Sequence, residues 1–95
     1  MVKTTTYNAG RKAGLERARA IAESYVCHAL NMGAAIAGEI RAASRETNTR
    51  EVDYGRGYAA GCALGASIAD SRSGFGANNS GSIAREIGEQ IERIG

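Results

Sequence analysis

The sequence predicts an all-α protein, and three observations lead to that prediction. The 95 residues contain no proline, and no stretch sustains the alternation of apolar and polar residues that is typical of a strand. Apolar and small residues instead recur at steps of three or four, the period at which one face of a helix meets a neighbour. A chain of this length makes one domain, in which we expect three helices.

The first helix is predicted over about residues 6–46, after a run of threonines that can cap its start. Its small and apolar positions follow one another at helical steps. They are Leu15, Ala18, Ala22, Val26, Ala29, Gly33, Ile36, Ile40 and Ala43. A break near Asn31 to Gly33 is left open.

Two further helices are predicted over about 49–70 and 82–94. Asn48 and Glu51 have the three-residue spacing of a capping box at the start of the first of these. Residues 71–81 are rich in glycine, serine and asparagine and read as a loop, after which Ser82 caps a short amphipathic helix. The isoleucines at 83, 87, 91 and 94 define the apolar face of that helix. We expect the long helix and the helix over 49–70 to pack as an antiparallel hairpin.

Three glycines, Gly57, Gly61 and Gly65, fall at four-residue spacing within the helix over 49–70. A glycine in a helix interior costs about 1 kcal/mol relative to alanine, so this repetition needs a compensating contact. We interpret the three as packing positions that let a second helix approach closely, because the first helix offers small residues at similar spacing.

The supply of large core side chains is small, since 18 of the residues are alanine. The larger core candidates are Leu15, Ile21, Val26, Leu30, Met32, Ile36, Ile40, Val52, Leu64, Ile68, Phe75 and the four C-terminal isoleucines. Ordering each residue costs roughly 1–2 kcal/mol of backbone entropy, which so few large side chains offset poorly in a single copy. We therefore expect a helical homo-oligomer.

Tyrosines and arginines gather at the starts of two predicted helices. The residues are Tyr7, Arg11, Tyr54, Arg56 and Tyr58. Such residues can stack on a nucleotide base and pair with phosphate. The same residue types anchor contacts between subunits and with other proteins, so self-association and a foreign protein remain alternatives.

A second candidate ligand site lies at the glycine-rich loop. Arg72 and Arg85 flank it, and the N–H groups of Ser80 to Ser82 begin a helix, where phosphate is favoured. Phe75 either stacks on a base or makes a core or subunit contact. The loop contains neither a Gly-Lys-Ser/Thr phosphate-binding pattern nor Gly-x-Gly-x-x-Gly after a strand.

Catalysis and metal binding are not expected. Cys27 and His28 are neighbours on a predicted helix and point about 100° apart, and there is no second histidine or metal-ligand spacing. With no long apolar run or signal peptide, we expect a soluble, cytoplasmic protein with no membrane contact and no cofactor. Residues 1–22 carry five basic and one acidic residue, a net +4, which makes nucleic acid a candidate partner. Because only about five basic residues cluster there, nucleic acid is less favoured than a nucleotide or a protein.

The run from Tyr7 to Leu15, followed by Ile21-Ala22-Glu23 and Ile40-Arg41-Ala42, resembles short alanine-rich accessory proteins of tailed bacteriophages. The resemblance implies a non-catalytic inhibitor of a host defence system, acting in the host cytoplasm. Proteins of this kind sequester a cyclic nucleotide signal or bind a host protein such as a CRISPR effector. We expect nucleotide sequestration, with direct protein binding, nucleic-acid association or a structural role in the phage particle as alternatives.

Overall fold

The computed structural model describes residues 2–45 and 51–94, and within them the chain is all-helical. Four helices follow one another: α1 (Val2–Ser24), α2 (Gly33–Ala43), α3 (Val52–Ser71) and α4 (Ser80–Ile94). The described part therefore has four helices where the sequence predicted three. The predicted cap at Asn48 lies outside the described residues.

The prediction of one long helix over 6–46 is wrong, because the chain forms two helices there, α1 and α2. After Ser24 the backbone tightens, with the N–H groups of Tyr25, Val26 and His28 donating to carbonyls three residues earlier at 3.1–3.2 Å. The chain then reverses direction, and the Asn31 side chain accepts a hydrogen bond from Gly33 N–H at 2.9 Å, at the start of α2. The break that the sequence left open thus extends over residues 25–32.

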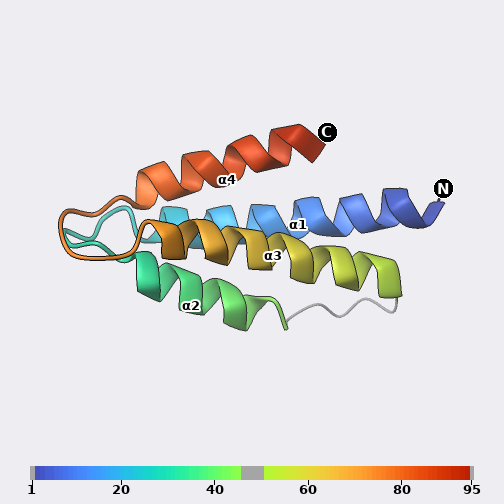
Figure 1. Cartoon of the computed structure of the whole chain (residues 1–95), viewed down its shortest axis with the longest axis horizontal. Helices are drawn as coiled ribbons and strands as arrows, with labels where there is room; N and C mark the ends of the chain where they lie inside the picture. Colours follow the sequence, from blue (N-terminus) through green and yellow to red (C-terminus); the bar gives the residue numbers. More distant parts are fainter. Residues whose placement is uncertain (1, 46–50, 95) are drawn as a thin grey trace.

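Helices α1 and α3 run parallel to each other, and α2 and α4 run in the opposite direction (Figure 1). The closest contacts show the parallel order: Gly57 lies against Tyr7, Gly61 against Arg11 and Gly65 against Ala18. The predicted antiparallel hairpin therefore fails for α1 and α3. Of the two helices that replace the predicted long helix, α2 runs antiparallel to α3 and α1 does not (Figure 1).

Glycines make the α1–α3 contact possible. A Cβ atom added to Gly57 or Gly61 would overlap the carbonyl oxygen of Tyr7 or Arg11, and one added to Gly10 or Gly14 would overlap a carbonyl of α3. The two backbones thus touch reciprocally, without intervening side chains.

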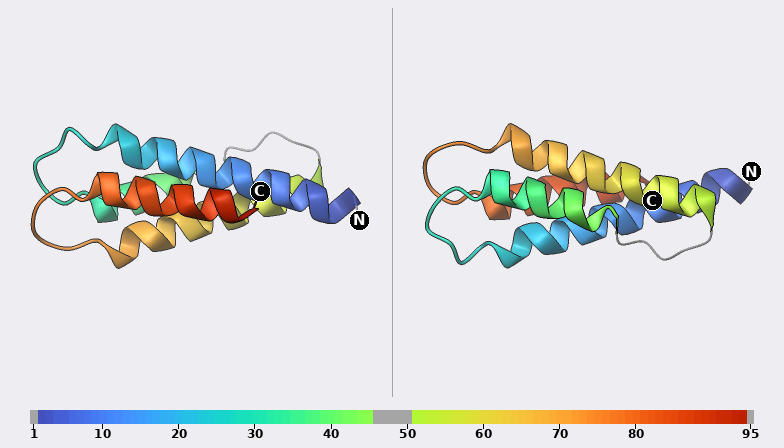
Figure 2. Two further views of the ribbon diagram at one scale, coloured as in Figure 1. Left: turned by 90° about the horizontal axis from the view of Figure 1, so that it is seen from above. Right: turned by 90° about the horizontal axis from the view of Figure 1, so that it is seen from below.

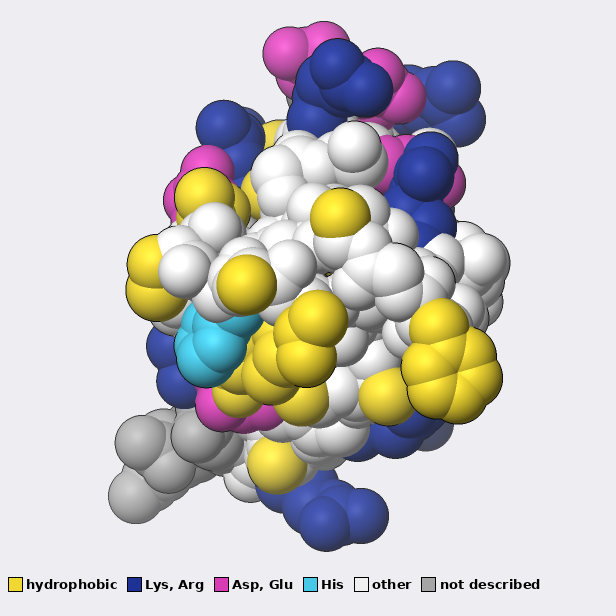
Figure 3. All heavy atoms as spheres, turned by 90° about the vertical axis from the view of Figure 1, so that its left-hand side faces the viewer, with side chains coloured by type: hydrophobic (Ala, Val, Ile, Leu, Met, Phe, Trp, Pro, Cys, Tyr) yellow, Lys and Arg dark blue, Asp and Glu magenta, His cyan; other side chains and the backbone are white. Residues whose placement is uncertain are grey.

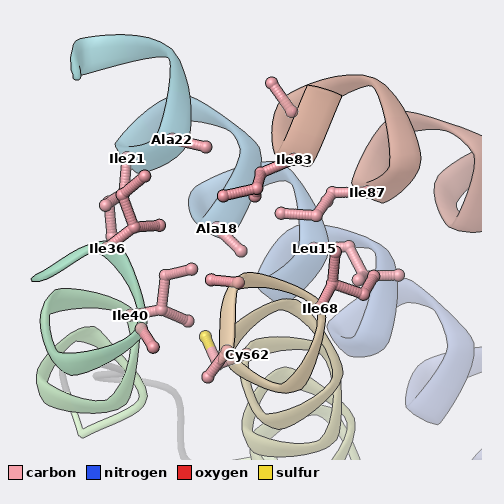
Figure 4. Packing of buried hydrophobic residues seen from close by; sticks show 14 of the residues in the cluster. Leu15, Ala18, Ile21, Ala22, Ile36, Ile40, Cys62, Ile68, Ile83 and Ile87 are labelled. Carbon is pink, nitrogen blue, oxygen red and sulfur yellow. The ribbon is translucent and has the colours of Figure 1, made fainter. Parts of the chain in front are cut away.

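The core lies where all four helices overlap, and it mixes isoleucine with alanine (Figure 4). Its large aliphatic members are Leu15, Ile21, Ile36, Ile40, Ile68, Ile83 and Ile87. Four of the predicted core residues are instead exposed: Val26, Leu30, Val52 and Phe75. Three of those four lie in connections between helices. Val26 and Leu30 lie between α1 and α2, where a continuous helix was predicted, and Phe75 lies between α3 and α4, in a loop whose path could not be predicted.

Helix α4 begins two residues earlier than predicted. Asn78 Oδ1 accepts the Ser80 N–H at 2.8 Å, so Asn78 rather than Ser82 caps this helix. Viewed from above and below, α4 and α2 cover only the part of the α1–α3 pair nearest these connections (Figure 2). The connections 25–32 and 72–79 lie together at that end of the molecule.

Candidate functional site

The structure separates the predicted ligand-binding residues into two groups. Tyr7, Arg11 and the residues 54–58 lie on the first halves of α1 and α3, whereas Arg72, Phe75 and the start of α4 lie toward the opposite end (Figure 1). A single ligand site that uses both groups is therefore not formed.

The first group is occupied with packing. The carbonyls of Tyr7, Arg11 and Tyr54 lie against glycines of the facing helix, and the Tyr58 side chain packs against the core. Arg56 is exposed on α3, and the other four residues are half-buried.

Two connecting loops form an uncharged apolar end, which we call the loop end: residues 25–32 and 73–79. These 15 residues include no Asp, Glu, Lys or Arg, although such residues make up 23% of the chain. Three large apolar side chains are exposed there, Val26 at 56%, Leu30 at 70% and Phe75 fully. Apolar side chains accordingly gather on this face, with charged ones around its margin (Figure 3).

Backbone hydrogen bonds join the two loops of the loop end. Asn31 N–H donates to the Gly76 carbonyl at 2.9 Å, and Asn78 N–H donates to the Ala29 carbonyl at 3.2 Å. These bonds flank an isolated antiparallel bridge between Leu30 and Ala77. The glycine-rich loop is therefore held by the other loop along part of its length.

Asn78 makes the largest number of these connections. Its Nδ2 donates to the carbonyls of Tyr25 at 2.6 Å, His28 at 2.5 Å and, less closely, Val26 at 3.3 Å, while its Oδ1 caps Ser80. One side chain thus fixes the exit from α1 to the entry of α4.

Phe75 projects from the tip of the second loop between two glycines. Gly74 has φ +147° and Gly76 has φ +121°, values that side-chain-bearing residues rarely adopt. The backbone therefore turns sharply on both sides of Phe75. The ring packs on no core residue, contrary to its prediction as a core candidate.

A polar groove of about 420 Å³ runs along α4 and reaches the end of α3. It is lined by Arg72, Ser82, Arg85, Glu86, Glu89, Gln90 and Arg93. Three predicted phosphate-site residues, Arg72, Ser82 and Arg85, thus line one groove. Arg72 is already paired with Glu86, its Nε and Nη2 lying 2.8 and 2.6 Å from Oε1.

The other two predicted loop-site residues do not line the groove. Ser80 is buried, and its hydroxyl bonds to the Tyr25 carbonyl and Asn78 within the fold. Phe75 lies at the loop tip. Sequence reasoning missed Glu86, Glu89 and Arg93, which the four-residue helical spacing from Ser82 and Arg85 would have placed on the same face.

The two cysteines do not form a reactive site. Cys27 is exposed and Cys62 is buried, and neither forms a disulfide among the described residues. Within the described residues no three His, Cys, Asp or Glu side chains gather where they could hold a metal ion.

The Tyr25 hydroxyl donates to Glu39 at 3.1 Å, and this hydrogen bond, with smaller effects of burial and of the Glu39 charge, raises the pKa of Tyr25.

No helix in the described ranges is long and apolar enough to cross a membrane. No protein-family model matches the chain, and no curated protein or solved structure proved similar to it. The loop end and the α4 groove are the two surfaces whose chemistry points to a function.

Proposed function

We propose that the protein is a non-catalytic binding protein that docks its loop end into an apolar, concave site on another protein. The observation that carries this proposal is the exposure of Val26, Leu30 and Phe75 on two loops without charged residues. Exposed apolar groups gathered on one face are typical of interaction sites, and aromatic side chains dominate the energy of such contacts.

The absence of charge defines the partner's chemistry. Burying an unpaired charge is costly, so a surface without Asp, Glu, Lys or Arg fits a site that is also uncharged. The hydrogen bonds from Asn78 and Asn31 hold the loops before binding, which reduces the entropy lost on docking.

A foreign protein suits this surface better than a second copy. The two shorter dimensions of the molecule are 23 and 18 Å, so an end-on contact buries about 400 Å² on each copy, or about 800 Å² in total. Stable interfaces bury about 1,200–2,000 Å². A concave partner can also enclose the sides of the loops, which a second convex end cannot do.

If the chain acts as its resemblance to phage accessory proteins implies, the partner is a host defence protein in the cytoplasm and docking inhibits it. The exposed loop end supports this protein-binding alternative over nucleotide capture at the same loop, because no arginine lies within residues 73–79 to pair with phosphate.

The test begins with a photo-crosslinking residue, p-benzoylphenylalanine, in place of Phe75. As a control, the same residue replaces Val52, which is also exposed and lies at the start of α3. We expect one protein to crosslink at position 75 and not at position 52. With that protein purified, Phe75→Ala should weaken binding about 30-fold or more, as for a central aromatic anchor, and Val52→Ala should leave it unchanged. Crosslinking to a second copy of the chain, or an unchanged affinity of Phe75→Ala, would overturn the proposal.

A further inference from the structure

The groove on α4 points to a second binding site, independent of the loop end. We propose that it takes a small molecule bearing two phosphate groups with hydroxyl or N–H groups between them, a class that includes dinucleotides. Its volume of about 420 Å³ lies in the range of small-ligand sites.

The order of charges along α4 carries the proposal. Arg85, Glu89 and Arg93 follow one another at four-residue steps and all line the groove, so two guanidinium groups flank one carboxylate. None of the three is ion-paired with another residue in the described ranges. The ion pair that lines the groove joins two other residues, Arg72 and Glu86. Their hydrogen-bonding capacity therefore remains available to a ligand.

Each of these groups suits a different part of such a molecule. A guanidinium is planar, always charged and able to donate two parallel hydrogen bonds to phosphate. The Glu89 carboxylate only accepts hydrogen bonds, so it fits sugar hydroxyls or N–H groups and repels a bare anion.

The Arg72–Glu86 pair lies at the end of the groove that reaches α3. Glu86 uses two of the five N–H groups of Arg72, at 2.8 and 2.6 Å, and holds the guanidinium in one orientation. The remaining donors can meet a phosphate at this end, and the Ser82 hydroxyl lines the same space. No aromatic side chain lines the groove among the described residues, so the proposal assigns recognition to phosphates and polar groups rather than to base stacking.

The experiment is calorimetry on the full chain with three probes: cyclic di-adenosine monophosphate, inorganic pyrophosphate and adenosine. We expect the cyclic dinucleotide to bind at least about tenfold more tightly than pyrophosphate, and adenosine to give no heat. Arg85→Gln and Arg93→Gln should each weaken dinucleotide binding about tenfold, as the loss of one charge-assisted contact does. Arg56→Gln, an exposed arginine on α3, is the control of equal charge change and should have no effect.

Glu89→Ala separates specific recognition from simple charge attraction. The proposal requires this variant to weaken dinucleotide binding and to strengthen pyrophosphate binding, because it removes both an acceptor and a negative charge. Stronger binding of both probes, equal effects of Arg56→Gln and Arg85→Gln, or no binding by the native chain would each overturn the proposal. The loop end plays no part here, so these results are independent of those with Phe75→Ala.

Discussion

Single glycines decide how closely α1 and α3 approach. At Gly57 an added Cβ would overlap the Tyr7 carbonyl oxygen and lie 2.8 Å from the Arg11 nitrogen, both backbone atoms that cannot rotate away. At Gly38, in α2, an added Cβ meets nothing within 4 Å. The same substitution should therefore have opposite effects at these two positions.

We expect Gly57→Ala to lower the free energy of unfolding by about 1–3 kcal/mol, the usual cost of overpacking. Gly38→Ala should raise it by about 0.5–1 kcal/mol, because alanine loses less backbone entropy in an exposed helix. Urea unfolding followed by circular dichroism measures both changes. A Gly57→Ala protein as stable as the native chain would mean that α1 and α3 do not touch through this glycine.

At the scale of elements, local spacing predicted helices but not where the chain reverses. The four-residue spacing of Ile83, Ile87 and Ile91 predicted α4, and that of Gly57 and Gly61 predicted a close contact, which these two make with α1. The reversal after Ser24 could not be predicted, because residues 25–32 continue the helical spacing of apolar residues. The carbonyls of Tyr25 and His28 accept hydrogen bonds from Asn78 instead of from a continuing helix, and Asn78 lies some 50 positions later in the chain.

Asn78 is therefore expected to matter more than an ordinary loop residue. Asn78→Ala removes the Nδ2 bonds to the first loop and the cap on Ser80, and should lower the free energy of unfolding by about 1–3 kcal/mol. The Asn31 amide, bonded to the Gly76 carbonyl, should exchange its hydrogen faster as the loops separate. Hydrogen-exchange NMR measures this directly.

Two comparisons make the Asn78 result specific. Asn78→Asp keeps the oxygen that caps Ser80 but loses the donor to the carbonyls of Tyr25 and His28, so it should still open the loops. Asn8→Ala, on α1, should leave Asn31 exchange unchanged, since the Asn8 side chain makes no hydrogen bond to the described residues. If Asn78→Asp protects Asn31 as well as the native chain does, the donor is not what joins the loops.

At the scale of the whole molecule, sequence reasoning found part of each candidate site. Arg72, Ser82 and Arg85 do line one groove, whereas Tyr7 and Tyr54 lie on the distant halves of α1 and α3. Val26 was predicted to be buried because it lies on the apolar stripe of a continuous helix, and Leu30 was a core candidate as one of the few large apolar residues. Only the reversal of the chain brings them to the same end of the molecule as Phe75. Because that reversal depends on hydrogen bonds from residues distant in the sequence, no local pattern predicts it.

The size of the core is the reason to expect self-association. Seven large aliphatic side chains are buried, together with a similar number of alanines, and α2 and α4 leave the first halves of α1 and α3 partly uncovered (Figure 2). We expect sedimentation equilibrium to give a multiple of the 9.9 kDa chain mass, and the melting temperature to rise with protein concentration, as binding to the folded state requires. Phe75→Ser should leave that mass unchanged, because we propose that the loop end binds a different protein. A single 9.9 kDa species whose cooperative melting does not depend on concentration would show that this small core suffices alone.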